Sequence, residues 1–282
     1  MKLPHWGVLV VSGCALAALT WLVLLIAAKP NPTADAHAYW NAAQPGADVY
    51  ARQWSVQVDA YVYSPAFLQL ITPVASNLDY PTFQLLWTIL QVAALAVAVG
   101  PIWAAGLVVP GIAIGGWPVT EEAFWGNIEL LIVLAVAIGF RYPATWAFLL
   151  LTKITPGIGL VWFAARREWR ALGIALGVTL AVAAASFLLS PGLWSAWIGL
   201  LTRGSSYHQP FETPLWLRVG LAALLVYCGA RTDRRWTIPI AVAAAHPAIW
   251  LQTLAIPVAL VPYFLLADRG ALRLWSRRAT GN

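Results

Sequence analysis

The stretch DAHAYWNA, residues 35–42, combines a carboxylate, an imidazole and two large aromatic side chains directly after the first long apolar run. Asp35 and Tyr39 stand at helical spacing, so a short surface helix would carry both on one face and present them to the edge of a membrane. Asp35 could there act as a general base toward a hydroxyl group, and the Tyr39 ring could pack on a sugar. Two alternatives stay open: Asp35 is a solvated loop carboxylate, or Asp59, ahead of YVYSP, is the base.

Lys153 stands in an apolar segment, within the sequence LTKITPG. Inserting a lysine into a membrane costs about 2.5 to 3.5 kcal/mol of free energy on insertion scales, so its position needs an explanation. One interpretation is that its side chain extends to the membrane surface. The other is that it lies at the apex of a broken helical hairpin, beside the end of a half-helix, and holds an anion such as a lipid phosphate.

Two acids and two histidines are further candidates for a site. Glu121 and Glu122 are adjacent, and they could act together or could be a charge pair stabilised by the dipole of a helix N-terminus. His208 and His246 are both predicted on the outer side of the membrane. A lone histidine is more often structural than functional. No cluster has the spacing of metal ligands, and the sequence has no DxD pair, Gly-rich phosphate loop or Ser/His/Asp arrangement.

The composition defines the class of protein that must position these residues. Of the 282 residues, 61% are hydrophobic and 10% are charged, and the mean hydropathy is +0.73. Several apolar runs reach the ~20 residues that a helix needs to cross a bilayer. Because hydrocarbon offers backbone groups no partner, and the runs lack a period-two polar alternation, we expect an all-α polytopic membrane protein. The first run, residues 6–28, is too long for a signal peptide and is predicted to be a retained span.

The positions of Lys and Arg predict the orientation. The clusters at 166–170, 231–235 and 269–278 are expected in the cytoplasm together with Lys2 and Arg141, which places both termini inside. The formal net charge of +6 then reflects orientation and affinity for anionic lipids, and nucleic-acid binding is not expected. Most carboxylates fall on the predicted outer side: Asp35, Asp48, Asp59, Asp79, Glu121, Glu122 and Glu212.

About ten helical passes are expected in one membrane domain, residues 1–282, several of them too short to cross alone. Pro156 removes a backbone donor and Gly157 loosens the turn, so segment 142–165 is predicted to be a hairpin of two half-helices. Another break is predicted at His246 and Pro247. Outer loops are expected at 29–64, 117–126 and 190–213, a basic cytoplasmic tail at 268–282, and helices at 6–28, 65–75, 80–100, 102–116, 127–140, 142–165, 170–189, 214–230, 238–245 and 249–267.

Several motifs, taken in order along the chain, resemble a known family. They are D-x-x-x-Y-W-x-A (Asp35, Tyr39, Trp40, Ala42), YVYSPAFLQLITP (61–73), Trp87, WGNIELLI (125–132) and RYPATWAFLLLTKITPGIGLVWFAARREWRAL (141–172). Together they are similar to glycosyltransferase family 87, integral membrane enzymes of the GT-C class. The resemblance covers most of residues 32–189, and R-x-P…LTK-x-TPG…RREWR is its specific part.

The resemblance implies a glycosyltransferase that uses a polyprenyl-phosphate sugar, often mannose, at the outer side of the plasma membrane. It implies that Asp35, in the first outer loop, is the catalytic base, and that Lys153 and Pro156 lie where the donor phosphate binds. No metal or other cofactor is expected. The expected partners are the donor, a lipid or glycan acceptor and membrane lipids, and the residues expected to bind substrate are Tyr39, Tyr63, Glu122, Asn127, Lys153 and His246.

Two other classes of function are weighed against this one. A transporter or lipid-linked-sugar flippase would also have broken helices and an intramembrane lysine, but the acids here gather on one side and no internal repeat is found. A non-catalytic accessory subunit is the third possibility, because the chain is short for the family and its last helices carry little recognisable motif.

Overall fold

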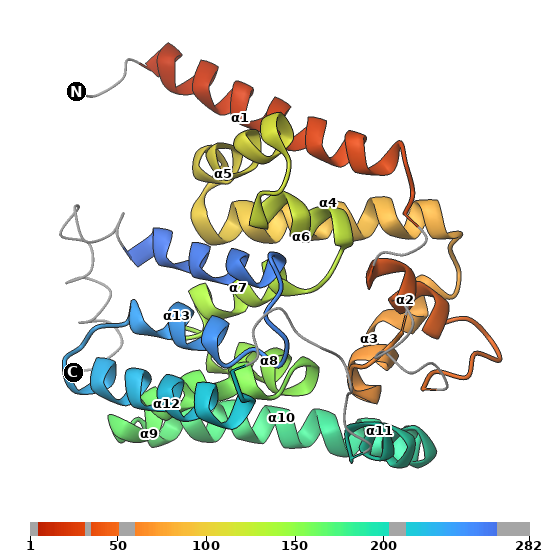
Figure 1. Ribbon diagram of the computed structural model, residues 1–282, viewed down its shortest axis with the longest axis vertical. Helices are drawn as coiled ribbons and strands as arrows, with labels where there is room; N and C mark the ends of the chain where they lie inside the picture. The colour runs from red at the N-terminus through yellow and green to blue at the C-terminus, as the bar shows by residue number, and fades with distance from the viewer. Residues whose placement is uncertain (1–4, 32–34, 51–59, 203–212, 264–282) are drawn as a thin grey trace.

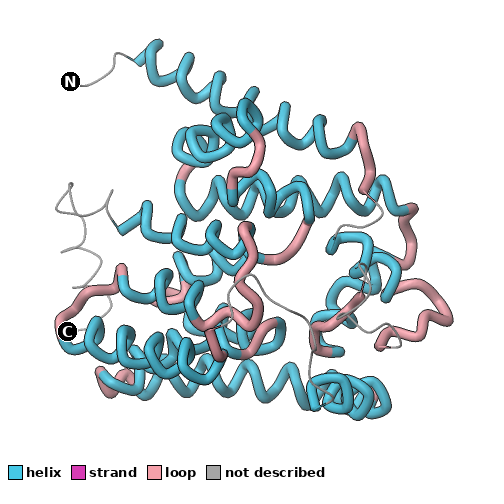
Figure 2. Tube along the Cα trace, viewed as in Figure 1, coloured by secondary structure: helices cyan, strands magenta, loops and turns pink. Residues whose placement is uncertain are grey.

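The computed structural model describes residues 5–31, 35–50, 60–202 and 213–263. All regular structure in these ranges is helical, which confirms the predicted all-α class (Figure 1, Figure 2). The α-helices are α1 (His5–Ala27), α2 (Asp35–Ala42), α3 (Pro65–Ala75), α4 (Tyr80–Val99), α5 (Pro101–Ile114), α6 (Pro118–Trp125), α7 (Glu129–Ile138), α8 (Trp146–Thr152), α9 (Val161–Ala165), α10 (Trp169–Leu189), α11 (Pro191–Thr202), α12 (Leu215–Arg231) and α13 (Thr237–Ala244); the 3-10 helices are η1 (Pro143–Thr145), η2 (Thr155–Leu160) and η3 (Gln252–Leu260).

The longer helices lie side by side across the view of Figure 1. α1 packs on α4 and α5, α4 packs on α7, and α7 packs on η3; further along, α12 packs on α13 and α10 packs on α8. The short helices α2, α3 and α11 gather at one end of this stack, on the right of the figure. α1 begins and α12 ends at the opposite end, on the left.

Within the described residues, three helices are long and apolar enough to cross a membrane. They span Gly7–Ala27, Tyr80–Val99 and Trp169–Leu189. A fourth crossing is possible if Pro101–Ile114 and Pro118–Trp125, which meet at 83°, count as one bent span. A polytopic membrane protein is therefore supported, and the ten passes expected from the sequence stay a prediction.

The apolar runs give most helix bounds correctly. The expected segments 6–28, 65–75 and 170–189 agree with α1, α3 and α10 to within a residue at each end. Both predicted breaks are also present: α8 and α9 are separate helices, and α13 ends just before His246. Proline and glycine thus interrupt the apolar runs where their backbone chemistry predicts.

Two of the segments predicted as outer loops contain short helices, and their place outside the membrane stays a prediction. Residues 118–125 form α6, which has Pro118 at its first position, Glu121 in its first turn and the left-handed Gly126 after its end. The position of Glu121 agrees with the alternative in which the dipole of a helix N-terminus stabilises its charge. Residues 191–202 form α11, which also begins at a proline. Both helices begin at a proline, whose fixed φ and missing amide donor suit the first position of a helix.

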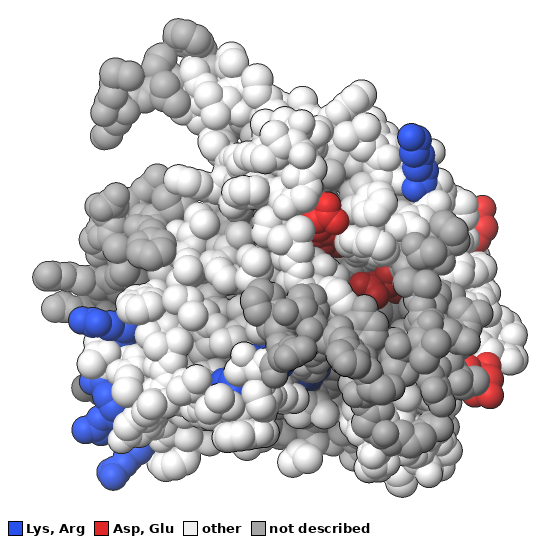
Figure 3. Space-filling view, in the orientation of Figure 1, with Lys and Arg blue, Asp and Glu red and all other residues white. Residues whose placement is uncertain are grey.

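The basic residues of several elements meet at one end of the molecule. Arg166, after α9, pairs with Asp233, after α12, at 3.0 Å and also donates to the Ala230 carbonyl. The Arg235 guanidinium lies 4.8 Å from the ring centre of Phe140, after α7. In Figure 3 most blue side chains accordingly gather at the lower left, and red side chains lie in the middle and toward the right edge.

Candidate functional site

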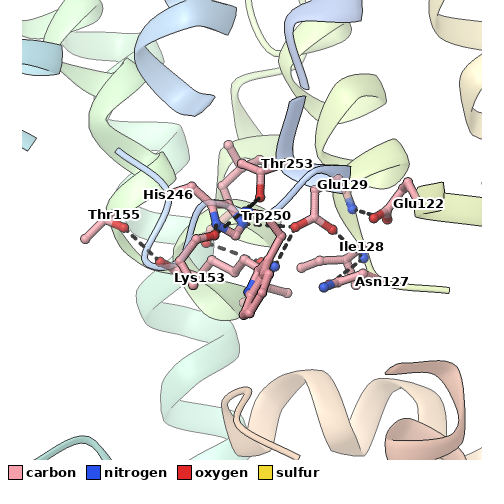
Figure 4. A network of polar contacts seen from close by, with 12 residues as sticks. Glu122, Asn127, Ile128, Glu129, Lys153, Thr155, His246, Trp250 and Thr253 are labelled. Carbon is pink, nitrogen blue, oxygen red and sulfur yellow. Dashed lines mark hydrogen bonds and ion pairs between the residues drawn. The ribbon is translucent and has the colours of Figure 1, made fainter. Parts of the chain in front are cut away.

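A buried ion pair joins two helices near the middle of the fold (Figure 4). Lys153 follows the last residue of α8, and Glu129 is the first residue of α7. The Lys153 Nζ lies 2.7 Å from Glu129 Oε1, and the two side chains are 9% and 1% exposed. Lys153 therefore does not extend to a surface, and the first interpretation of this lysine is wrong.

The backbone after Lys153 is strained. Ile154 has φ +49° and ψ −66°, and the amide of Thr155 donates to the Lys153 carbonyl at 2.6 Å. These values approach those of a classic γ-turn, which is rare and costly for a β-branched residue. Such strain persists where the surrounding structure enforces it, and here it ends α8 and starts η2 at the lysine.

Glu129 is held at the N-terminus of its own helix, where the helix dipole favours a carboxylate. Its Oε2 accepts from the Ile128 amide at 3.1 Å, and the Asn127 side-chain oxygen accepts from the same amide at 2.8 Å. The Glu129 amide in turn donates to Glu122 Oε1 at 2.7 Å. The turn between α6 and α7 thus brings both glutamates into one cluster.

The second carboxyl, Glu122, is fully buried in the same cluster. Its Oε2 has no hydrogen-bond partner within the described structure. Since Lys153 already pairs with Glu129, an ionised Glu122 would leave one uncompensated negative charge in the interior. We therefore infer that, of the two carboxyls Glu122 and Glu129, Glu122 is the protonated one. Its hydroxyl group can then donate a hydrogen bond to a ligand.

His246 completes the cluster from the break between α13 and η3. Its Nδ1 lies 2.5 Å from the Ala248 carbonyl and its Nε2 lies 3.0 Å from Glu129 Oε1, although the second contact lacks hydrogen-bond alignment. Burial, with the nearby charge of Lys153, lowers the pKa of His246 against the opposing effect of Glu129. The lowered pKa favours the neutral ring, and the contact with the Ala248 carbonyl, which can only accept, places the ring proton on Nδ1.

Two tyrosines and an asparagine connect the cluster to α2. The Tyr63 hydroxyl donates to Asn127 Oδ1 at 2.6 Å, and the Tyr39 hydroxyl lies 3.1 Å from both groups. Lys153 Nζ lies 5.5 Å from the centre of the Tyr63 ring. Burial, and then the charges of Asp35 and Glu129, raise the pKa of Tyr63, so its hydroxyl stays protonated and serves as a donor.

Tyr39 does not face the membrane edge, and that prediction is wrong. Its side chain is 1% exposed and lies among the rings of Tyr63, Phe67 and Trp87. The helix that carries it is present as predicted, but the residue four positions after Asp35 points inward. A buried tyrosine hydroxyl needs a partner, and the oxygen of Asn127 supplies one.

Asp35 is the first residue of α2, one turn before Tyr39, and is half-buried. Its charge is close enough to act on Tyr39, Tyr63 and Glu122. The other candidate base, Asp59, and the candidate His208 both lie outside the described residues.

The residues expected to bind substrate do come together, but their strongest interaction was missed. Tyr39, Tyr63 and Asn127 form one hydrogen-bonded group, and Glu122, Lys153 and His246 surround Glu129, which was not a candidate. A signal for Glu129 was present: it is a lone acid in the run NIELLIVLAVAI, and such an acid in an apolar helix needs a buried cation. Glu121 lies outside the cluster and accepts from Trp125 Nε1 at 3.2 Å.

An apolar groove opens beside the tyrosines. It has a volume of about 250 Å³ and lies between α3, α4, α7 and α8. Phe67 and Trp87 line it, and both rings also contact Tyr39, so its inner wall is shared with the hydrogen-bonded group. Among the described residues, no group of His, Cys, Asp and Glu could hold a metal ion.

The helical fold and the candidate spans indicate an integral membrane protein, and the buried charged cluster gives it a polar interior site. The model of glycosyltransferase family 87 matches residues 61–279, which is most of the chain, so the protein belongs to that family. The match includes Tyr63, Glu122, Glu129, Lys153 and His246, and it begins after Asp35 and Tyr39. No curated protein and no solved structure matches the chain.

Proposed function

We propose that this glycosyltransferase transfers a hexose, mannose in the first instance, from a polyprenyl-phosphate donor to a lipid or cell-envelope glycan at the outer membrane interface. The observation that carries the proposal is the buried Lys153, held by Glu129 beside the group of Tyr39, Tyr63 and Asn127. A buried cation next to several hydroxyl and amide groups suits a ligand that joins a phosphate to a sugar.

Lys153 can serve a phosphate while it stays near Glu129. An ammonium group has three donors, and the contact with Glu129 uses one of them. As the bond between the sugar carbon and the phosphate oxygen breaks, its electrons pass to the phosphate, whose negative charge increases. A cation positioned beforehand stabilises that added charge more than it stabilises the bound donor.

The apolar groove supports a lipid-linked donor. Its lining is aromatic and aliphatic, as an isoprenoid chain requires, and its wall shares Phe67 and Trp87 with the Tyr39 group. A chain in this groove would lead toward the polar cluster, where the phosphate and sugar would lie. In this proposal the groove binds the lipid part of the donor, and the polar cluster binds its phosphate and sugar.

Asp35 is the proposed general base. In the proposed step it takes the proton of the acceptor hydroxyl while that oxygen bonds to the anomeric carbon of the sugar and the phosphate leaves. Its place at the start of α2, one turn from Tyr39, puts a carboxylate near the cluster and half open to an incoming acceptor. A general base contributes about 10²- to 10⁴-fold to such a step.

The test is transfer of radiolabelled sugar from synthetic polyprenyl-phosphate mannose and glucose to acceptors in a membrane extract, with purified wild type and Asp35→Asn. We expect label to move with the wild type and to fall by about 10²- to 10⁴-fold with Asp35→Asn, while donor binding is retained. Asp79→Asn is the matched control, since Asp79 is an exposed carboxylate that caps α4 by accepting from the Thr82 amide at 3.0 Å. Full turnover by Asp35→Asn would remove Asp35 from this role, and a wild type that neither binds nor transfers either sugar would contradict the proposed donor.

A further inference from the structure

Arg218 is a buried arginine outside the cluster described above. It lies in the first turn of α12, and only 7% of the residue is exposed. A buried guanidinium is costly unless its donors are satisfied, so the groups that it contacts indicate what it does. Within the described part of the chain, the hydrogen bonds of its guanidinium go to backbone carbonyls of neighbouring segments.

The guanidinium of Arg218 binds both sides of the break that carries His246. Its Nη1 donates to the carbonyls of Ala244 at 3.1 Å and His246 at 2.6 Å, and its Nη2 donates to the Pro247 carbonyl at 3.1 Å. Its Nε donates to the Thr213 carbonyl at 3.2 Å, just before α12. One planar group therefore ties the end of α13 to the segment that follows it.

This arrangement satisfies a helix end that would otherwise be unstable. The last carbonyls of α13 have no partner within the helix, and a positive charge there also complements the helix dipole. The break at His246 and Pro247 has no regular structure of its own to fix its shape. Three hydrogen bonds from a rigid fork fix it instead, and one of them is made to His246, whose ring lies 3.0 Å from Glu129.

We propose that Arg218 is a positioning residue of the site: it fixes the break between α13 and η3 so that the His246 ring stays against Glu129 and Lys153. In this role Arg218 acts through His246, whose backbone carbonyl it binds, and not on the substrate itself. For turnover the inference rests on the proposed function, but the position of the His246 ring can be measured without any turnover.

The first experiment follows the imidazole directly. Wild type, Arg218→Lys and Arg218→Met are produced with ¹⁵N-labelled histidine rings in lipid nanodiscs, and the His246 signals are assigned with His246→Gln. We expect both Arg218 variants to shift the His246 signals in the direction that Glu129→Gln shifts them, with Arg218→Lys intermediate because it keeps the charge and loses the fork. Arg231→Gln, an exposed arginine in the last turn of the same helix, should leave them unchanged.

The second experiment separates positioning from a general loss of stability. If Arg218 acts through His246, Arg218→Lys should lower kcat on the order of 10- to 100-fold in the wild-type background and cause little further loss in His246→Gln. Unchanged His246 signals in both Arg218 variants, or losses in kcat that multiply fully in the double variant, would overturn the proposal. If the wild type transfers no sugar, the proposed function fails, and the ring signals still decide whether Arg218 positions His246.

Discussion

At the scale of single residues, the site depends on the opposite charges of Lys153 and Glu129, each of which would be costly to bury alone. Glu129 Oε1 accepts a hydrogen bond from Lys153 Nζ at 2.7 Å, and the carboxyl of Glu122 lies in the same cluster. A buried pair of this kind adds little stability over an apolar pair of similar volume, whereas removing one partner costs about 3 to 5 kcal/mol. The presence of such a pair in an apolar core therefore favours a chemical role over a structural one.

The pairing predicts strong non-additivity between substitutions at these two positions. Lys153→Met should lower the free energy of unfolding by about 3 to 5 kcal/mol, because Glu129 is left buried without a cation. The double variant Lys153→Met/Glu129→Gln should be more stable than the sum of the single losses predicts, with a coupling of about 1 to 3 kcal/mol. Denaturant unfolding in detergent micelles measures all four proteins.

The exposed pair of Arg166 and Glu168 is the matched control for this cycle. Its atoms lie 2.9 Å apart, and its side chains are 33% and 38% exposed, so its coupling should stay below about 1 kcal/mol. Equal couplings for the two pairs would mean that burial does not strengthen the interaction of Lys153. Independent losses at Lys153 and Glu129 would contradict the pairing itself.

At the scale of elements, the hairpin from α8 to α9 positions Lys153 by close packing. Gly159 in η2 lies against the ring of Trp146 at the start of α8, and a Cβ on this glycine would overlap that fully buried ring. Trp146 is also held by a hydrogen bond to the Gly139 carbonyl at 3.3 Å, so it has no room to move aside. The two halves of the hairpin therefore approach each other only because glycine stands at this contact.

Gly159→Ala should separate the halves of the hairpin and move the lysine at its apex. We expect a loss of about 1 to 3 kcal/mol in unfolding free energy from overpacking, together with a lower kcat. Gly177→Ala in α10 is the control, since a Cβ there meets no atom within 4 Å. It should stabilise the protein by up to about 1 kcal/mol and leave turnover unchanged. A tolerated Gly159→Ala would show that the contact with Trp146 does not set the hairpin geometry.

Local chemistry in the sequence predicts elements better than it predicts their partners. The bounds of α3 and the breaks at Lys153 and His246 follow from apolar runs, proline and glycine, which act within a few residues. The contact of Tyr39 with Asn127 joins residues far apart in the chain, so no local pattern could indicate that Tyr39 turns inward. The sequence could indicate that Glu129 is a buried acid that needs a cation. It could not indicate that the cation is Lys153, because that pairing depends on the packing of α7 against α8.

At the scale of the whole molecule, most of the described arginines gather at one end. Arg166, Asp233 and Arg235 lie together where α7, α9 and α12 end, on the left of Figure 1, whereas α2, α3 and the start of α4 lie on the right. If the positive end is cytoplasmic, as the distribution of arginines predicts, the end with Asp35 faces outside. A polyprenyl-phosphate donor and its acceptor would then reach the site from the outer side.

The orientation can be tested with single cysteines. Cys14 and Cys228 are first replaced by Ala, and one cysteine is then introduced either at Asn77, between α3 and α4, or at Arg234, beyond α12; both positions are exposed. In intact cells a membrane-impermeant maleimide should label Asn77→Cys and spare Arg234→Cys, and opening the membrane should allow both to react. The reverse pattern would place Asp35 in the cytoplasm and would rule out an acceptor on the outer face. Labelling of both in intact cells would mean that the two ends do not lie on opposite sides, so the stack of helices would have to lie differently in the bilayer than the arginines predict.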